Sequence, residues 1–107
     1  MALERRINLA IETLVGLQVV DDKGYPSYRD EMTSILERYG GGFGYDFKIA
    51  EMLKSPNTAP INRVFTISFP DQSARDAFFS NEDYLHIRQR HFENAVTHTT
   101  IMASYHR

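Results

Sequence analysis

The four histidines are the first residues to consider for catalysis or metal binding: His86, His91, His98 and His106. Two metal ligands on one helix face need a spacing of four residues, whereas His86 and His91 are five apart and would point in different directions. His98 and His106 would share one side of a strand, but about 26 Å apart at about 3.3 Å per residue. The spacing predicts no local metal pair, although ligands from different elements could still converge.

A group of polar residues on otherwise apolar faces is the stronger candidate for chemistry. It comprises Tyr28, Arg29, Tyr45, Arg63 and His91. If the gap between the helices and the sheet is open, we expect these side chains to line one cleft. There His91 could serve as a general base, and Arg63 could stabilise a developing oxyanion or enolate. Tyr28, Arg29 and Tyr45 would bind a small anionic or phenolic compound.

The same residues also have a purely structural interpretation. The phenols and His91 can pack as amphipathic groups at the edge of the core. Arg63 or Arg29 can pair with Asp46 or with a glutamate. The serines offer no alternative nucleophile, because neither Ser34 nor Ser68 lies in a G-x-S-x-G context.

Composition narrows the class of protein. The chain has 107 residues, of which 42% are hydrophobic and 24% are charged. This composition predicts one globular domain over residues 1–107. Within it, residues 1–12 are an N-terminal extension of undetermined role. The net charge is −2 and no basic block is interleaved with aromatics, so we expect no nucleic-acid partner. Cysteine is absent, which excludes disulfides, thiolate metal sites and cysteine nucleophiles. We also expect no cofactor.

The apolar segments are too short for a membrane span. None approaches the roughly 20 apolar residues that a transmembrane helix needs. The opening MALERRINLAIETLVGLQVV is interrupted by Asn8 and Glu12 and lacks the small-residue cleavage site of a signal peptide. We therefore expect a cytoplasmic protein without a membrane partner.

One helix is clear in the sequence. Its apolar face is formed by Tyr25, Tyr28, Arg29, Met32, Ile35, Leu36 and Tyr39. Pro26 is acceptable only in the first turn, so the helix should begin within residues 22–25, and Gly40 should end it in a left-handed conformation. The glycines that follow are predicted to turn the chain. A phosphate-binding loop would precede a helix N-terminus, and here the glycines follow a helix C-terminus.

Four strands are predicted, over residues 13–20, 43–53, 61–69 and 96–106. In the second strand we place Phe43, Tyr45, Phe47 and Ile49 toward the helices, and Gly44, Asp46, Lys48 and Ala50 on the opposite face. In the third, Ile61, Arg63, Phe65, Ile67 and Phe69 share a face. Asp71 and Asn81 are the expected N-caps of helical segments over 72–79 and 82–95.

The resulting order, β-α-β-β-α-β, predicts an α+β ferredoxin-like sandwich with a mainly antiparallel four-stranded sheet. Its helices would cover one sheet face. The other face would carry Leu14, Val20, Val64 and Ile101 beside Asp46, Lys48, Asn62, Thr66 and Ser68. Because that mixture is too apolar for water, we expect it to pack against a second copy, which gives a homodimer in the form of a dimeric α+β barrel.

The stretches GYPSYRDEMTSILERYGGGF, NRVFTISFP and DAFFSNEDYLHIR resemble an uncharacterised domain-of-unknown-function family (number thirteen-thirty) in the dimeric α+β-barrel superfamily. The resemblance covers roughly residues 13–105 and implies the same fold. The superfamily includes cofactor-independent monooxygenases, haem-degrading enzymes, lyases and proteins that only bind. The asparagine, tryptophan and histidine set of the haem-degrading relatives cannot be assembled, because this chain has no tryptophan.

Two functions therefore remain open. One is a cofactor-free enzyme of the oxygenase or isomerase type, acting on a small aromatic or polyketide-like compound. The other is a non-catalytic dimerisation or ligand-binding module. An open pocket in which Tyr28, Arg63 and His91 converge would favour the enzyme, and a filled gap between helices and sheet would favour the module.

Overall fold

A computed structural model describes residues 9–107 and shows one four-stranded antiparallel sheet. Its strands are β1 (Ile11–Val19), β2 (Gly42–Lys48), β3 (Arg63–Phe69) and β4 (Val96–His106). Their spatial order is β2-β3-β1-β4, so that β1 and β3 are central and β2 and β4 are edges. The predicted connection order is confirmed. β1 takes in Ile11 and Glu12 from the expected N-terminal extension, and residues 1–8 of that extension lie outside the described part.

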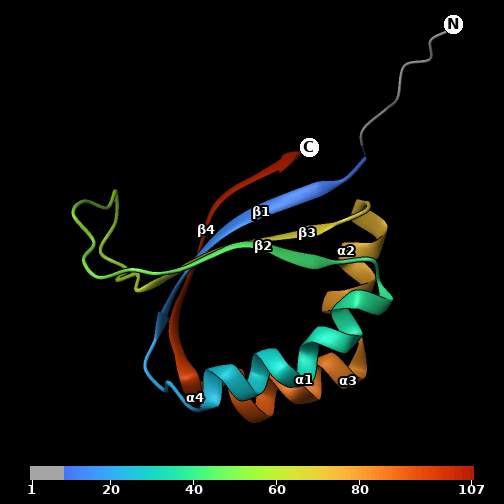
Figure 1. Cartoon of the computed structure of the whole chain (residues 1–107), viewed down its shortest axis with the longest axis horizontal. Coiled ribbons are helices and arrows are strands. Elements are labelled where there is room, and N and C mark those ends of the chain that lie inside the picture. The colour runs from blue at the N-terminus through green and yellow to red at the C-terminus, as the bar shows by residue number, and fades with distance from the viewer. Residues whose placement is uncertain (1–8) are drawn as a thin grey trace, which may run out of the picture.

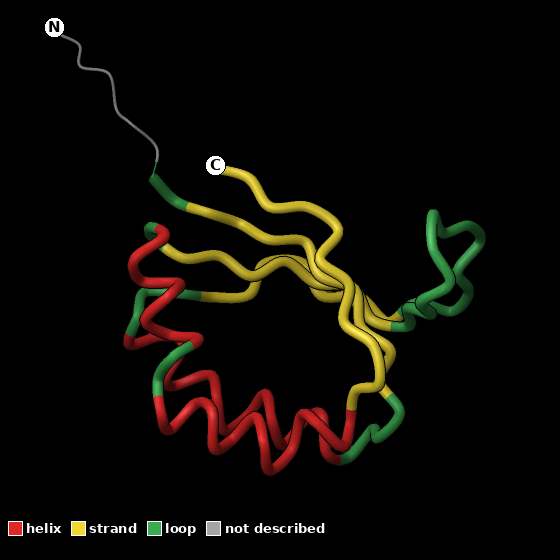
Figure 2. The backbone as a smooth tube through the Cα atoms, turned by 180° about the vertical axis from the view of Figure 1, so that it is seen from behind, coloured by secondary structure: helices red, strands yellow, loops and turns green. Residues whose placement is uncertain are grey.

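The helices lie on one side of the sheet (Figures 1 and 2). They are α1 (Gly24–Arg38), which connects β1 to β2, and α2 (Gln72–Phe79), which follows β3. A second run then contains α3 (Glu82–Ile87), the π-helical segment η1 (Arg88–Phe92) and α4 (Glu93–Ala95), and leads directly into β4. The sheet and this helical layer enclose the core.

Local sequence signals explain where α1 begins and ends. Backbone N–H groups of Lys23 and Gly24 donate to Asp21 Oδ1, both at 3.0 Å, and these bonds hold the pKa of the Asp21 carboxyl below its ordinary value. Pro26 lies in the first turn, as predicted. Gly40 follows the helix with φ of +75°, the left-handed conformation in which glycine is favoured. The predicted helix end is thus confirmed.

Both predicted N-caps downstream are also confirmed. Asp71 Oδ1 accepts from the Ala74 N–H at 2.8 Å and begins α2. Asn81 Oδ1 accepts from the Tyr84 N–H at 2.9 Å and begins α3. Each side chain satisfies one of the N–H groups that the first helical turn leaves unpaired. The Asn81 cap also fixes where Tyr84 enters the core.

The core is built from large side chains of both layers. Tyr25, Met32 and Leu36 of α1, Leu17 of β1 and Phe78 of α2 are the largest fully buried residues. Phe65, Ile67 and Phe69 of β3 are buried beneath them, which confirms their predicted face. Removing such a side chain would cost about 2–5 kcal/mol of stability.

The faces of β2 differ from the prediction because the strand contains a β-bulge. The register between β2 and β3 shifts between Phe43 and Asp46, and the Tyr45 N–H donates to Thr66 Oγ1 at 2.9 Å. After the shift, Asp46 faces the helices and binds two arginines there. Tyr45 and Phe47, predicted to face the helices, stack on each other at 5.7 Å and are 71% and 51% exposed. Their predicted placement, and that of Asp46 and Lys48, was wrong.

The sheet face opposite the helices is uncovered in the described chain. No helix crosses it (Figure 1). The segment 49–62 between β2 and β3 projects from one end of the sheet, and its Met52 and Pro56 border an apolar groove of about 470 Å³ with Val64 and Met102. Within residues 9–107, none of the helices has the length and apolar character needed to cross a membrane.

Candidate functional site

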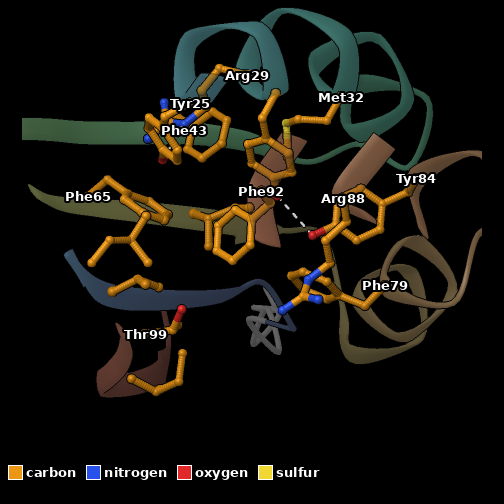
Figure 3. A pocket seen from close by; sticks show the side chains of 15 residues that line it. Tyr25, Arg29, Met32, Phe43, Phe65, Phe79, Tyr84, Arg88, Phe92 and Thr99 are labelled. Carbon is orange, nitrogen blue, oxygen red and sulfur yellow. Dashed lines mark hydrogen bonds between the residues drawn. The ribbon is translucent and has the colours of Figure 1, made fainter. Parts of the chain in front are cut away.

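A pocket of about 210 Å³ lies between the sheet and the helices (Figure 3). Every strand of the sheet, together with α1, α2, α3 and η1, contributes to its wall. The lining consists of Val15, Leu17, Tyr25, Tyr28, Arg29, Met32, Phe43, Phe65, Ile67, Phe79, Tyr84, Arg88, Phe92, Thr99 and Ile101. Most of these side chains are aliphatic or aromatic. An apolar cavity of about 150 Å³ is large enough for benzene, so this volume suits a single-ring compound.

Two phenols supply the polar groups in the interior of the pocket. The hydroxyls of Tyr28, on α1, and Tyr84, on α3, are 2.9 Å apart, and the two side chains are only 6% and 3% exposed. Burial raises the pKa of both phenols, so both stay protonated at neutral pH. One hydroxyl donates to the other, and the accepting phenol keeps a proton that it can donate to a ligand.

Arg88 adds a positive charge beside this pair. It is the first residue of η1, its guanidinium carbon lies 4.9 Å above the Phe92 ring, and its side chain is 41% exposed. The hydrogen bond with Tyr28 and the charge of Arg88 partly offset the rise that burial causes in the Tyr84 pKa. Arg88 Nη1 also donates to Glu93 Oε2 at 3.1 Å. Such an exposed ion pair contributes about 1 kcal/mol or less, so a ligand anion can compete for this arginine.

A second polar cluster, of Tyr25, Arg29, Asp46 and Arg63, lies at another side of the pocket. Arg29 donates from Nε to the Tyr25 hydroxyl at 2.8 Å and from Nη1 to Asp46 at 3.3 Å. Its guanidinium carbon is 3.8 Å from the centre of the Phe43 ring. Arg29 Nη2 is buried without a hydrogen-bond acceptor among the described residues, and the aromatic faces around it provide the favourable environment for its charge.

Arg63 is held by Asp46 in a two-point ion pair. Its Nε and Nη2 donate to the two Asp46 oxygens at 2.8 and 2.9 Å. This pairing holds the pKa of Asp46 below its ordinary value and raises the pKa of Arg63. Arg63 lies toward the helices, as predicted, but borders a separate polar pocket of about 190 Å³ with Lys48 and Asn62. Its ion pair is the structural alternative that the sequence left open.

His91 lies away from the pocket. Its Nε2 is 2.7 Å from Glu31 Oε2, and Arg90 Nη1 donates to the other oxygen of that carboxylate at 2.8 Å. The π-helical geometry of η1 takes more residues per turn than an α-helix, so His91, three residues after Arg88, falls further short of a full turn and is rotated away from the inward face. The next residue takes the inward place. That residue is Phe92, whose ring is 4.9 Å from that of Tyr28. The predicted inward placement of His91 was wrong.

Of the predicted site residues, the structure brings Tyr28 and Arg29 to the pocket, and leaves Tyr45, Arg63 and His91 outside it. The sequence reasoning missed Tyr84, Arg88 and Phe92. Tyr84 could have been found, since it follows the Asn81 cap by three residues at a position of the apolar stripe. Nothing in the sequence pattern marked the π-helical turn that selects Phe92 over His91.

Among residues 9–107, no aspartate, glutamate, histidine or lysine lines this pocket. Its phenols are kept neutral by burial. The side chains that form it can therefore donate hydrogen bonds and attract negative charge, but none of them is suited to remove a proton from a bound compound at neutral pH.

Solved structures share this fold at low sequence identity. A protein of unknown function from Rhodopseudomonas palustris has a TM-score of 0.76 at 17% identity, with 94% of this chain and 84% of that chain covered. A dabb family protein with a ferredoxin-like fold from Mesorhizobium loti has a TM-score of 0.60 at 15% identity, covering 92% and 96%. A dimeric protein of unknown function and ferredoxin-like fold from Bacteroides fragilis has a TM-score of 0.58 at 8% identity, also covering 92% and 96%.

These similarities show that the fold is ferredoxin-like, and at such identities they show the fold alone. No curated protein matches the chain. Residues 13–105 match a family described as Domain of unknown function (DUF1330), which agrees with the resemblance seen in the sequence. The match spans nearly the whole chain, and the protein belongs to this DUF1330 family.

Proposed function

We propose that this is a homodimeric small-molecule-binding protein whose pocket between sheet and helices takes a small aromatic compound. The observation that carries the proposal is the combination of an apolar pocket of about 210 Å³ with the Tyr28–Tyr84 hydroxyl pair inside it. A few polar groups that converge within an apolar pocket are typical of ligand sites. The walls would hold the ring, and the phenols would orient one oxygen of the ligand.

The composition of the lining favours binding over acid–base catalysis. An isomerase would need a base within hydrogen-bond reach of its substrate, and the polar side chains of the described lining are neutral phenols, arginines and Thr99. His91 could act as this base only if η1 adopted a different helical geometry that directed the His91 side chain into the pocket. Of the two enzyme types, the pocket fits a cofactor-free oxygenase better than an isomerase. A substrate that ionises without a base needs only stabilisation of its negative charge, and the phenols and Arg88 would supply it.

A pocket-filling variant tests this proposal. Thr99 borders the pocket from the exposed edge strand β4, so Thr99→Trp would fill the cavity without replacing a core residue. Thr97→Trp is the matched control, on the same strand, exposed and outside the lining. In thermal-shift measurements, single-ring phenols and benzoates should stabilise the wild type and Thr97→Trp. The same compounds should not stabilise Thr99→Trp. Equal shifts in all three proteins would refute binding at this pocket.

The homodimer would form through the sheet face opposite the helices. Tyr45 and Phe47 are exposed there, next to the apolar groove lined by Met52, Val64 and Met102. Exposed apolar surface of this kind marks an interaction site, and a second copy would cover it by two-fold symmetry. The Bacteroides fragilis structure with the same fold is described as dimeric, which supports this choice of partner. Light scattering after size exclusion should give twice the chain mass, and Phe47→Glu should shift it toward the monomer.

A further inference from the structure

We infer that the ligand of the pocket is an aromatic carboxylate with a single ring, whose carboxylate is held by Arg88 beside the Tyr28–Tyr84 pair. This inference rests on the proposed binding function and adds the chemical class of the ligand. It follows from the charge, the size and the arrangement of donors in the pocket.

The charge of the lining is positive. Arg29 and Arg88 both border the pocket, and no acidic side chain of the described part of the chain does. The Arg29 guanidinium is already held in place, since it donates to the Tyr25 hydroxyl at 2.8 Å and to Asp46 at 3.3 Å and is stacked on Phe43. Asp46 is shared with Arg63, so this cluster keeps one net positive charge. Within residues 9–107, the ion-pair partner of Arg88 is Glu93, at 3.1 Å, and both side chains are substantially exposed. Of the two arginines, Arg88 is therefore the one that can accept a new anion.

The donors at this end of the pocket suit two oxygens. Arg88 offers N–H groups arranged as a planar fork, and the phenol that accepts within the Tyr28–Tyr84 pair offers one O–H. Figure 3 shows the hydroxyl bond of this pair next to Arg88, on a different side of the pocket from Arg29. A carboxylate has two oxygens and one negative charge, so it can bind Arg88 and a phenol together.

The remainder of the pocket suits an aromatic ring. The rings of Phe92 and Tyr28 are 4.9 Å apart, and those of Phe43 and Phe65 are 5.4 Å apart in an edge-to-face arrangement. These aromatic walls stack well on a flat ring and offer no hydrogen bonds to a sugar or a peptide. The volume of about 210 Å³ leaves room for one ring with a small substituent.

Isothermal titration with three probes tests this inference: benzoate, benzamide and acetate. Benzamide has the shape of benzoate without its charge, and acetate has the charge without the ring. The wild type should bind benzoate roughly tenfold more tightly than benzamide, since a hydrogen bond to a charged group is stronger than one to a neutral group. Acetate should bind more weakly than benzoate by about tenfold or more, because acetate lacks the ring.

Two variants at neighbouring arginines separate the role of Arg88 from a general charge effect. Arg88→Gln should bring the affinities for benzoate and benzamide to within roughly twofold of each other. Arg90→Gln is the matched control, because Arg90 is in the same segment but binds Glu31 outside the pocket, and it should keep the preference of the wild type. Glu93→Gln should tighten benzoate binding by removing the competing carboxylate.

The outcomes distinguish the inference from the proposed function. If benzamide binds as tightly as benzoate, the carboxylate assignment is overturned and the proposal of a binding pocket stands. If both arginine variants lose the preference equally, the assignment to Arg88 is overturned. If neither aromatic probe binds the wild type at millimolar concentration, the inference and the proposed function both fail.

Discussion

The buried Tyr28–Tyr84 pair makes a sharp prediction about stability, because its two hydroxyls depend on each other. We consider the variants Tyr28→Phe and Tyr84→Phe and the double variant. Each single change removes one hydroxyl and leaves the other buried, with exposures of 6% for Tyr28 and 3% for Tyr84. In the double variant no unsatisfied hydroxyl remains, and two phenylalanine rings fill nearly the same volume.

The expected magnitudes follow from the partners that remain. In Tyr28→Phe, the Tyr84 hydroxyl is left beside the positive charge of Arg88, which favours its oxygen, so the variant should lose about 1 kcal/mol. In Tyr84→Phe, no other hydrogen bond is described for the Tyr28 hydroxyl, and the loss should be about 2 kcal/mol. Replacing both partners by apolar groups of the same shape can be nearly neutral, so the double variant should lose about 1 kcal/mol or less.

Urea unfolding of the four proteins at one fixed protein concentration measures this cycle, since a dimer couples stability to concentration. The two single losses would sum to about 3 kcal/mol, so the double variant should be about 2 kcal/mol more stable than additivity predicts. Two small and additive losses would show that the hydroxyls do not bond to each other. In that case the pocket would not contain the polar pair on which the binding proposal depends.

Three further predictions concern titration and capping. Burial raises the pKa of Tyr25, Tyr28 and Tyr84, so the folded protein holds these protons more tightly than the unfolded chain does. The free energy of unfolding should therefore fall above about pH 10, by up to about 1.4 kcal/mol per pH unit for each tyrosine. An unfolding midpoint that does not change with pH in that range would contradict this. Arg63 is the main cause of the lowered pKa of Asp46, so the stability that the Asp46 carboxylate contributes is present above about pH 4 and is lost as the pH falls through the folded pKa. Asp46→Asn should therefore make the unfolding midpoint less dependent on pH in acid. The same acid dependence in wild type and variant would count against the ion pair. Asp71→Ala should cost about 1 kcal/mol in urea unfolding by removing the cap of α2, whereas Gln72→Ala, one residue further on and exposed, should cost less.

The features that follow regular periods could be predicted from the sequence. The apolar face of α1, with Pro26 in its first turn and Gly40 after its end, gave the bounds of that helix closely. Asp71 and Asn81 are capping residues whose hydrogen bonds are local, so the chain alone determines them. The order of helices and strands then restricted the topology to the ferredoxin-like arrangement that the structure has.

The errors in the predicted site have one physical origin, an extra residue within a regular element. The bulge in β2 moved Tyr45 to the uncovered face and brought Asp46 to Arg63. The π-helical segment η1 turned His91 toward Glu31 and placed Phe92 in the pocket. A shift of one residue reverses the face in a strand and changes it by about 100° in a helix. Tertiary packing selects such shifts, so the periodicity of the sequence did not reveal them.

The most direct test of the ligand pocket is a heteronuclear NMR titration of the isotope-labelled protein with benzoate. A ligand held between the sheet and the helices should shift the amide signals of Tyr28, Phe92 and Thr99 together, as one saturable site, since these residues border the pocket from α1, η1 and β4. The signals of Tyr45 and Phe47 on the opposite face should stay in place. Saturable shifts confined to that face, or no saturable shift at all, would contradict the account.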